Sequence, residues 1–250
     1  MHFLLIDLYL LAAGIVAGLL STIAGMASLV SYPVLLSMGL SPVAANVTNT
    51  ASQIFTGIGS TLSSAPELNS AKHATGVVTA WALSGSVLGC ILLLAAPAES
   101  FAKAVPFLIA FAGCLMLYSL FAKAKPVKVT KPHPLLKGLA VFIVGIYIGY
   151  FGASAGVIML AILILTEHLP FATTNAIKNF VSFSANFLAM CIYAFTAAIH
   201  WDLVIKMGIG FLIGGWLGPK IVRHVPIRPL RIVIAIAAFG LAGYLFITTY

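Results

Sequence analysis

Charged residues are scarce in this sequence. Asp, Glu, Lys and Arg make up only 7% of the 250 residues, whereas 62% are hydrophobic, and the mean hydropathy is +1.13. A soluble domain carries about 25% charged residues, so this chain could not cover a water-facing surface. Its apolar runs are long and unbroken rather than alternating, which excludes an outer-membrane barrel. The sequence therefore predicts an all-α protein that crosses a membrane several times.

Acidic residues are the scarcest charged group, and each of the five lies near the end of an apolar segment. They are Asp7, Glu67, Glu99, Glu167 and Asp202. Without a carboxylate in the middle of a segment, a sodium site or a proton relay built on carboxylates is disfavoured. The sequence also has no cluster of histidines and carboxylates for a metal, and no nucleophile beside a base. We therefore expect neither an enzyme nor a cofactor, and no ATP as the energy source.

Cysteine is also rare in this sequence. Cys90, Cys114 and Cys191 all lie in apolar runs, which favours small buried side chains over a disulfide or metal set.

The net charge of +8 would suggest a nucleic-acid partner in a soluble protein. In a membrane protein, basic loops fix the orientation instead, so we expect no nucleic acid. The first apolar run has no basic segment before it, so we expect no cleavable signal peptide.

Two of the apolar segments are too long for one crossing, which needs about 20 residues. The segments are 3–38, 42–63, 73–97, 101–122, 135–165, 172–198, 203–219 and 229–249. Small residues interrupt the first near 24–28 and the fifth near 149–156. Each of these two is predicted to be a broken helix or a hairpin, re-entrant or crossing twice, followed by three ordinary spans.

The two halves of the chain repeat each other. Gly18 and Gly25 recur as Gly145 and Gly152, 40–46 recurs as 169–175, and Gly85-x-x-x-Gly89 recurs as Gly214-x-x-x-Gly218. The predicted organisation is one membrane domain with repeats at 1–122 and 138–250, joined by a linker at 123–137. The glycine pairs are typical of closely packed helices.

The lysines and arginines predict an orientation in the plasma or inner membrane. If the linker at 123–137 is cytoplasmic, only Lys103 and Lys206 fall outside, and both chain ends lie outside. The basic residues placed inside with the linker are Lys72, Lys220, Arg223, Arg228 and Arg231. The loop at 39–42 is then outside and its counterpart at 166–171 inside, so the halves are inverted. Inverted repeats with broken helices are typical of secondary transporters, whose site lies at the interface of the repeats.

Two stripes of polar residues are the candidate substrate site. Their spacing of three and four residues places each stripe on one helical face. The stripe on 42–63 consists of Asn46, Asn49 and Gln53, with Thr48 beside it, and the stripe on 172–198 of Asn175, Asn179, Ser182 and Asn186. We interpret the matched stripes as substrate ligands. The alternative is that these groups only hold helices together, as such residues commonly do in membranes.

Lys178 is the one basic residue predicted to lie within a span. A lysine in the middle of a span costs about 2.5–3.5 kcal/mol on insertion scales. An anionic substrate could compensate that charge, and so could the carbonyls at a helix C-terminus. Alternatively, the side chain reaches the cytoplasmic edge.

The two breaks offer a second means of binding an anion. Helices that restart near Ser28 and Ala155 would direct free N–H groups at the middle of the membrane. The absence of side chains at Gly25, Gly152 and Gly156 would let an oxyanion approach the backbone. Ser28 and Ser154 would add hydroxyl donors. The alternative is a packing break where helices cross closely.

Several stretches resemble the TauE/SafE sulfite exporter family. They are "AANVTNTASQIFTGIGS" (44–60), "GYFGASAGVIMLA" (149–161), "TTNAIKNFVSFSANF" (173–187), the turn at 199–201 and "GGWLGPKIVRHVPIRPLR" (214–231). The resemblance covers nearly the whole chain in order. It implies a secondary carrier that exports sulfite, sulfonates or related small organosulfur anions by alternating access. An anion channel of the same fold and a membrane scaffold that does not transport are the alternatives. Proton coupling and any oligomeric state are compatible with the sequence.

Overall fold

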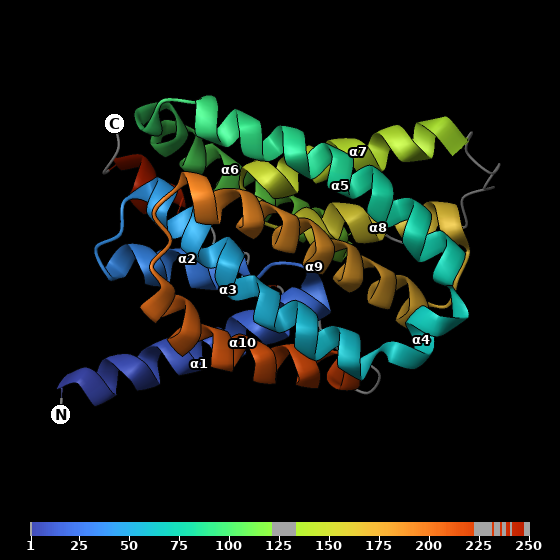
Figure 1. Cartoon of the computed structure of the whole chain (residues 1–250), viewed down its shortest axis with the longest axis horizontal. Helices are drawn as coiled ribbons and strands as arrows, with labels where there is room; N and C mark the ends of the chain where they lie inside the picture. The colour runs from blue at the N-terminus through green and yellow to red at the C-terminus, as the bar shows by residue number, and fades with distance from the viewer. Residues whose placement is uncertain are drawn as a thin grey trace.

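The structure is a computed structural model, and it describes residues 2–121 and 134–222 together with 232, 236, 239–240 and 242–247. The described chain is helical throughout, as the sequence predicts. The helices are α1 (His2–Ala24), α2 (Ser28–Ser37), α3 (Pro42–Ser63), α4 (Ala65–Ser70), α5 (Lys72–Ala95), α6 (Ala98–Phe121), α7 (Pro134–Tyr150), α8 (Ala155–Glu167), α9 (Phe171–Thr196) and α10 (Trp201–Val222). The long helices run roughly along the same axis of the molecule (Figure 1).

The helices follow the predicted apolar segments. Among the described residues, four helices are long and apolar enough to cross a membrane: Leu5–Ala24, Lys72–Ala95, Phe171–Thr196 and Trp201–Ile221. The short helix α4 was not predicted; its proline in the first turn, a favoured position, is the local signal for it. Most of the predicted span at 229–249, residues 123–133 of the predicted linker at 123–137, and Arg223, Arg228 and Arg231 lie outside the described residues. The last four residues of that linker, 134–137, are the start of α7.

Both long segments are broken where the sequence predicts. α1 ends at Ala24 and α2 begins at Ser28, while α7 ends at Tyr150 and α8 begins at Ala155. Gly25 and Gly152 have φ of +72° and +71°, a conformation that glycine adopts without a steric clash. α2 has 10 residues and α8 has 13, so they extend only about 15 and 20 Å, less than the ~30 Å apolar layer. Each broken segment is therefore a hairpin whose tip lies inside the molecule.

The glycine pairs pack the halves together. Gly214 and Gly218 of α10 lie against α1, next to the Ile15 carbonyl and the Thr22 side chain. Likewise, Gly85 and Gly89 of α5 lie against the backbone of α7. α1 of the first half thus packs along α10 of the second, and α7 of the second half packs along α5 of the first. The small residues allow this close approach. The packing role predicted for these glycines is confirmed.

α3 and α9 lie side by side and run in opposite directions. The first half of α3 contacts the turn between α9 and α10, because the His200 amide donates to Thr48 Oγ1 at 3.2 Å. Near the other end of α3, Gly57 lies against Phe183 in the first half of α9. The turn before α3 and the turn before α9 consequently lie at opposite ends of the molecule (Figure 1).

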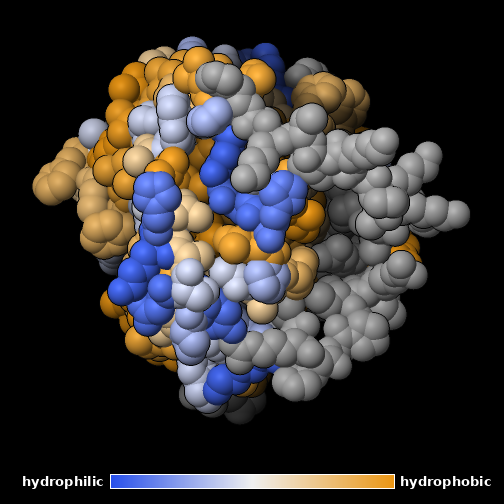
Figure 2. All heavy atoms as spheres, turned by 90° about the vertical axis from the view of Figure 1, so that its right-hand side faces the viewer, coloured by the Kyte–Doolittle hydropathy of each residue, from blue (hydrophilic) through white to orange (hydrophobic). Residues whose placement is uncertain are grey.

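The surface fits a lipid environment. Large apolar side chains along the helices are exposed, among them Ile91, Ile143 and Ile205, at 52%, 63% and 58%. Hydrophilic residues gather instead on the end of the molecule that carries α4 and the start of α5 (Figure 2). Because α5 packs parallel to α7 and α3 parallel to α10, Lys72, Lys137 and Lys220 all lie toward this end.

Candidate substrate site

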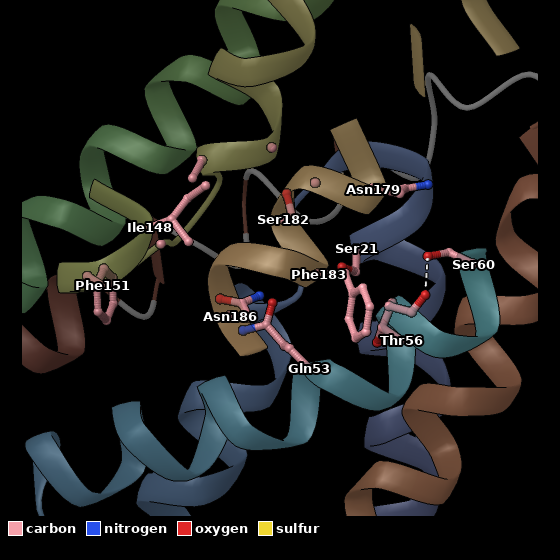
Figure 3. Close-up of a pocket in the computed structure, with 15 residues that line it drawn as sticks. Ser21, Gln53, Thr56, Ser60, Ile148, Phe151, Asn179, Ser182, Phe183 and Asn186 are labelled. Carbon is pink, nitrogen blue, oxygen red and sulfur yellow. Dashed lines mark hydrogen bonds between the residues drawn. The ribbon is translucent and has the colours of Figure 1, made fainter. Parts of the chain in front are cut away.

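A polar cavity lies where the tips of the two hairpins meet α3 and α9 (Figure 3). It is lined by Ser21, Gly25, Gln53, Thr56, Gly57, Ser60, Ile148, Phe151, Gly152, Ala155, Gly156, Asn179, Ser182, Phe183 and Asn186. The centre of a water molecule can occupy about 30 Å³ of this space, which corresponds to roughly two water positions. The cavity therefore suits a ligand of a few heavy atoms.

The polar groups of the cavity wall are amides and hydroxyls, without a carboxylate. The acidic residues lie elsewhere, and three of them form ion pairs with lysines. Asp7 Oδ1 lies 2.8 Å from Lys206 Nζ and Glu99 Oε1 lies 2.7 Å from Lys103 Nζ, while Glu167 pairs with Lys137. An anion in the cavity would therefore meet hydrogen-bond donors and no fixed negative side chain.

Half of the predicted site residues line this cavity. They are Gly25, Gln53, Gly152, Gly156, Asn179, Ser182 and Asn186. The structure thus brings together residues from both halves of the chain. The amides of Gln53 on α3 and Asn186 on α9 point toward one another (Figure 3).

Three polar residues of the wall were missed in the sequence. Thr56 and Ser60 continue the spacing of three and four residues beyond Gln53, so the pattern could have identified them. Thr56 is buried, and its hydroxyl has no hydrogen-bond partner in the described part of the chain. Ser21 comes from the last turns of α1, where the sequence carries no pattern that distinguishes it.

Asn49 and Ser28 lie behind the cavity wall. Asn49 Nδ2 donates to Ser28 Oγ at 3.1 Å, and Asn49 Oδ1 accepts from Ser31 Oγ at 2.5 Å. Gln53 Nε2 also donates to Ser28 Oγ, at 3.4 Å. These bonds attach the start of α2 to α3 and hold the Gln53 amide at the cavity.

Asn46 and Asn175 join the two halves of the chain. Asn46 Nδ2 donates to the Tyr150 carbonyl and Asn175 Nδ2 to the Thr22 carbonyl, both at 3.0 Å. Carbonyls at a helix C-terminus have no partner within the helix. Each asparagine therefore caps the broken helix of the other half, and neither lines the cavity.

Thr48 and Ser154 also lie outside the wall. Thr48 accepts from the His200 amide, as described above. Ser154 is buried in the second break with φ of +59°, and its hydroxyl has no hydrogen-bond partner among the described residues. It stands directly before Ala155, which does line the cavity.

Lys178 is buried, with only 1% of its surface exposed. Its Nζ donates to the Ser21 carbonyl at 3.1 Å and to the Thr22 carbonyl at 3.2 Å. Of the alternatives that the sequence offered, this placement corresponds to helix C-terminal carbonyls, where the helix dipole is negative. The ammonium group is outside the cavity wall, although Ser21 lines it.

Replacing Lys178 with methionine should lower stability more than it changes selectivity. The substitution removes two hydrogen bonds to a charged donor and exposes the α1 carbonyls, which costs about 1.5–3 kcal/mol. Thermal unfolding in detergent measures this, with Lys103→Met as the control, since Lys103 is exposed and forms an ion pair with the exposed Glu99 one turn away. An unchanged melting temperature for Lys178→Met would contradict the capping role.

Aromatic side chains close one side of the cavity. The rings of Tyr32 and Phe151 pack edge to face at 5.4 Å, and Phe101 packs against Tyr150 and Phe151 at 5.6 and 5.8 Å. Tyr32, Phe101 and Phe151 are almost completely buried. Phe101 lies in the first turn of α6, which begins at Ala98, so the cluster lies on the side of the cavity toward the end of the molecule that holds the turn before α3.

Broken helices that meet in the interior, around a polar cavity within an apolar exterior, define a helical membrane protein of the transporter class. The chain belongs to the sulfite exporter TauE/SafE family, whose model matches residues 10–245.

Two curated relatives cover nearly the whole chain. A "Probable membrane transporter protein" of Haemophilus influenzae is 26% identical over 231 residues, which is 90% of each chain. A "Probable membrane transporter protein ORF9" of Sinorhizobium sp is 24% identical over 238 residues, covering 92% of this chain and 89% of the relative. No solved structure matches this chain. The family and both relatives are described as membrane transporters rather than enzymes, in agreement with the sequence-based expectation.

Proposed function

We propose that this protein is a secondary transporter that carries sulfite, a sulfonate or a related small organosulfur anion by alternating access. The observation that supports this most directly is the cavity at the hairpin tips, whose wall offers amides and hydroxyls without a carboxylate. Its small size fits an anion of a few heavy atoms. The membership in a family named for sulfite export favours sulfur oxyanions among small anions.

The anion would be held by neutral donors and by two helix N-termini. α2 and α8 both begin next to the cavity, at Ser28 and Ala155, and neither has a side-chain cap. The first N–H groups of a helix have no partner within the regular helix and can bind anions. In α8 the amides of Ala155 and Val157 already donate to the preceding turn, so the Gly156 amide at the cavity would be the donor for the anion. In α2 the amides of Leu29, Val30 and Ser31 are bonded in the same way, which leaves the Ser28 amide. Asn179, Ser182 and Asn186 would add side-chain donors, and hydrogen bonds to an ionised acceptor are the strong ones.

Lys178 would act on the anion through α1 rather than by contact. Its ammonium group lies against the negative C-terminal end of α1, whose Ser21 lines the cavity. Neutralising that end of the helix dipole makes the electrostatic potential in the cavity more favourable for an anion. Lys178 could therefore favour anion binding without contacting the substrate, which would explain why a lysine is buried here despite the energetic cost.

The two halves would form an inverted repeat that rocks around the cavity. The antiparallel course of α3 and α9 supports this, as does the reciprocal packing of α1 on α10 and of α7 on α5. One bundle comprises α1, α3 and α10, the other α5, α7 and α9, and they meet along α3 and α9. Each bundle contains helices from both halves. Rocking of one bundle on the other would expose the cavity to either side in turn.

The orientation predicted from the sequence remains our proposal. Lys72, Lys137 and Lys220 lie toward one end of the molecule, and Lys103 and Lys206 lie toward the other. The positive-inside rule then favours a cytoplasmic position for the end with α4. Both chain ends would be outside a plasma or inner membrane, and the aromatic cluster would close the outer side of the cavity.

Transport in liposomes tests the proposal. Purified protein should give saturable uptake of labelled sulfite without ATP, and a high internal concentration of unlabelled sulfite should accelerate that uptake. Such counterflow requires a carrier, because a channel gives flux that neither saturates nor responds to internal substrate in this way. Sulfate, taurine and sulfoacetate added outside would rank the substrates by competition. Flux without saturation would support a channel, and no flux of any of these anions would refute the proposed function.

A further inference from the structure

A second hollow lies at the end of the molecule that carries α4, between α4, the start of α5 and α9. Its volume is about 450 Å³, and it is separate from the polar cavity. Lys72 and Asn69 are at its polar end, and Leu83 and Phe180 contribute apolar wall. We refer to it as the α4–α5 groove.

The face of α5 in the groove changes from charged to apolar along the helix. Lys72, Gly76, Thr79 and Leu83 are spaced by four, three and four residues, so they share one helical face. At 1.5 Å per residue, Lys72 and Leu83 are about 16 Å apart along the helix. A charged group at the membrane surface followed by an apolar wall at depth matches the order of groups in a phospholipid.

Contacts within the described part of the protein do not explain why two positions in the groove are occupied by Gly76 and Thr79. Gly76 is in the interior of α5, where glycine is the poorest helix former after proline, and a Cβ at this position would have no atom within 4 Å. The glycine is therefore not required for helix packing. The Thr79 hydroxyl is buried without a hydrogen-bond partner in the described part of the chain. A molecule lying in the groove would account for both.

We propose that the α4–α5 groove binds an anionic phospholipid. Its phosphate would lie at Lys72 and Asn69, the glycerol would lie over Gly76, the Thr79 hydroxyl would bond an ester oxygen, and an acyl chain would lie along Leu83 and Phe180. The charge favours an anionic headgroup, because Lys72 is exposed and forms no ion pair with a described residue. Basic residues near a membrane surface attract anionic lipids. The site is independent of the proposed transport function.

Native mass spectrometry of the detergent-purified protein tests the site. Phosphatidylglycerol and phosphatidylcholine with the same acyl chains are titrated separately, and inorganic phosphate is added as a competitor. Phosphatidylglycerol should bind preferentially, and phosphate should not displace it. Lys72→Gln should weaken this binding about fivefold, the contribution of one lysine near a membrane surface. Gly76→Leu should nearly abolish it, because the added side chain occupies the groove, and its Cβ would meet no protein atom within 4 Å.

Two matched variants serve as controls. Lys103→Gln removes the same charge near the opposite end of the molecule. Gly240→Leu adds the same side chain at another helical glycine whose Cβ would meet nothing within 4 Å. Both should bind phosphatidylglycerol like the unmodified protein. Equal binding of the two lipids, or equal losses in the groove variants and their controls, would overturn the proposal. All four variants should unfold cooperatively and close to the temperature of the parent protein, so misfolding would not explain a loss.

Discussion

Adding a single methyl group at the contact between the hairpin tips should destabilise the protein severely. A Cβ on Gly156 would lie 2.5 Å from Gly25 Cα, and a Cβ on Gly25 would lie 2.5 Å from Gly156 Cα. Both neighbours are backbone atoms, so relief requires the two hairpins to move apart. We expect Gly156→Ala to cost about 3 kcal/mol, at the upper end of the range for overpacking, and to abolish transport. Thermal unfolding and the liposome assay measure the two effects.

Alanine substitutions at three glycines distinguish the cost of a steric clash from the cost of a left-handed backbone conformation. Gly25 has both a close neighbour and φ of +72°, whereas Gly39 has φ of +85° with nothing within 4 Å of a Cβ. Gly39→Ala should therefore cost only the left-handed conformation, about 1–2 kcal/mol. Gly156 shows only the steric effect, so Gly25→Ala should be the most damaging of the three. If Gly39→Ala and Gly156→Ala were equally harmful, close contact of the hairpin tips would not be what the structure requires.

Introducing a carboxylate at Asn186 should abolish anion transport while leaving the fold intact. Aspartate has nearly the shape of asparagine, and Asn186 lines the cavity with 9% of its surface exposed. Two like charges about 4 Å apart repel by about 4 kcal/mol at an effective dielectric constant of 20, equivalent to a loss of roughly 1,000-fold in affinity. Asn186→Leu removes only a hydrogen bond to a charged group and should raise the apparent KM about 10- to 100-fold.

The pH dependence of Asn186→Asp identifies the charge as the cause. An ionised carboxylate repels the anion, whereas the protonated acid carries no charge and can donate a hydrogen bond. Transport should therefore recover as the pH falls. Ser184→Ala is the control, since the Ser184 hydroxyl bonds to the Phe180 carbonyl of its own helix and is outside the cavity wall. Full activity of Asn186→Asp at neutral pH would refute an anion site in this cavity.

The sequence predicts where the helices break but not what the breaks meet. An apolar run that is longer than one membrane span must be interrupted, because a span has a nearly fixed length. The clusters of small residues at 24–28 and 149–156 mark the places of these interruptions. That Gly25 lies directly on Gly156 could not be predicted, since the two glycines are 131 positions apart in the chain. The same holds for Ser21, which faces the cavity because α1 ends there.

Helical spacing predicted which residues share a face of α3. In the folded protein some of these residues form structural hydrogen bonds, and others line the cavity. Asn46 and Asn49 share a face of α3 with Gln53, yet Asn46 caps α7, Asn49 bonds Ser28, and only Gln53 reaches the cavity. The helical period of 3.6 residues predicts which side chains lie on one face of a helix. It does not predict which residues of the neighbouring helices contact that face at each depth in the membrane.

The sequence by itself determined a helical membrane protein with two repeated halves, two broken segments and few carboxylates. Composition and length decide these properties, because lipid accepts neither uncapped backbone nor many charges. The tertiary structure alone decided that Lys178 lies on the end of α1 and that Asn179, Ser182 and Asn186 face the hairpin tips. The environment of a polar group inside a membrane depends on which distant segments pack around it, and that is settled only when both halves are folded together.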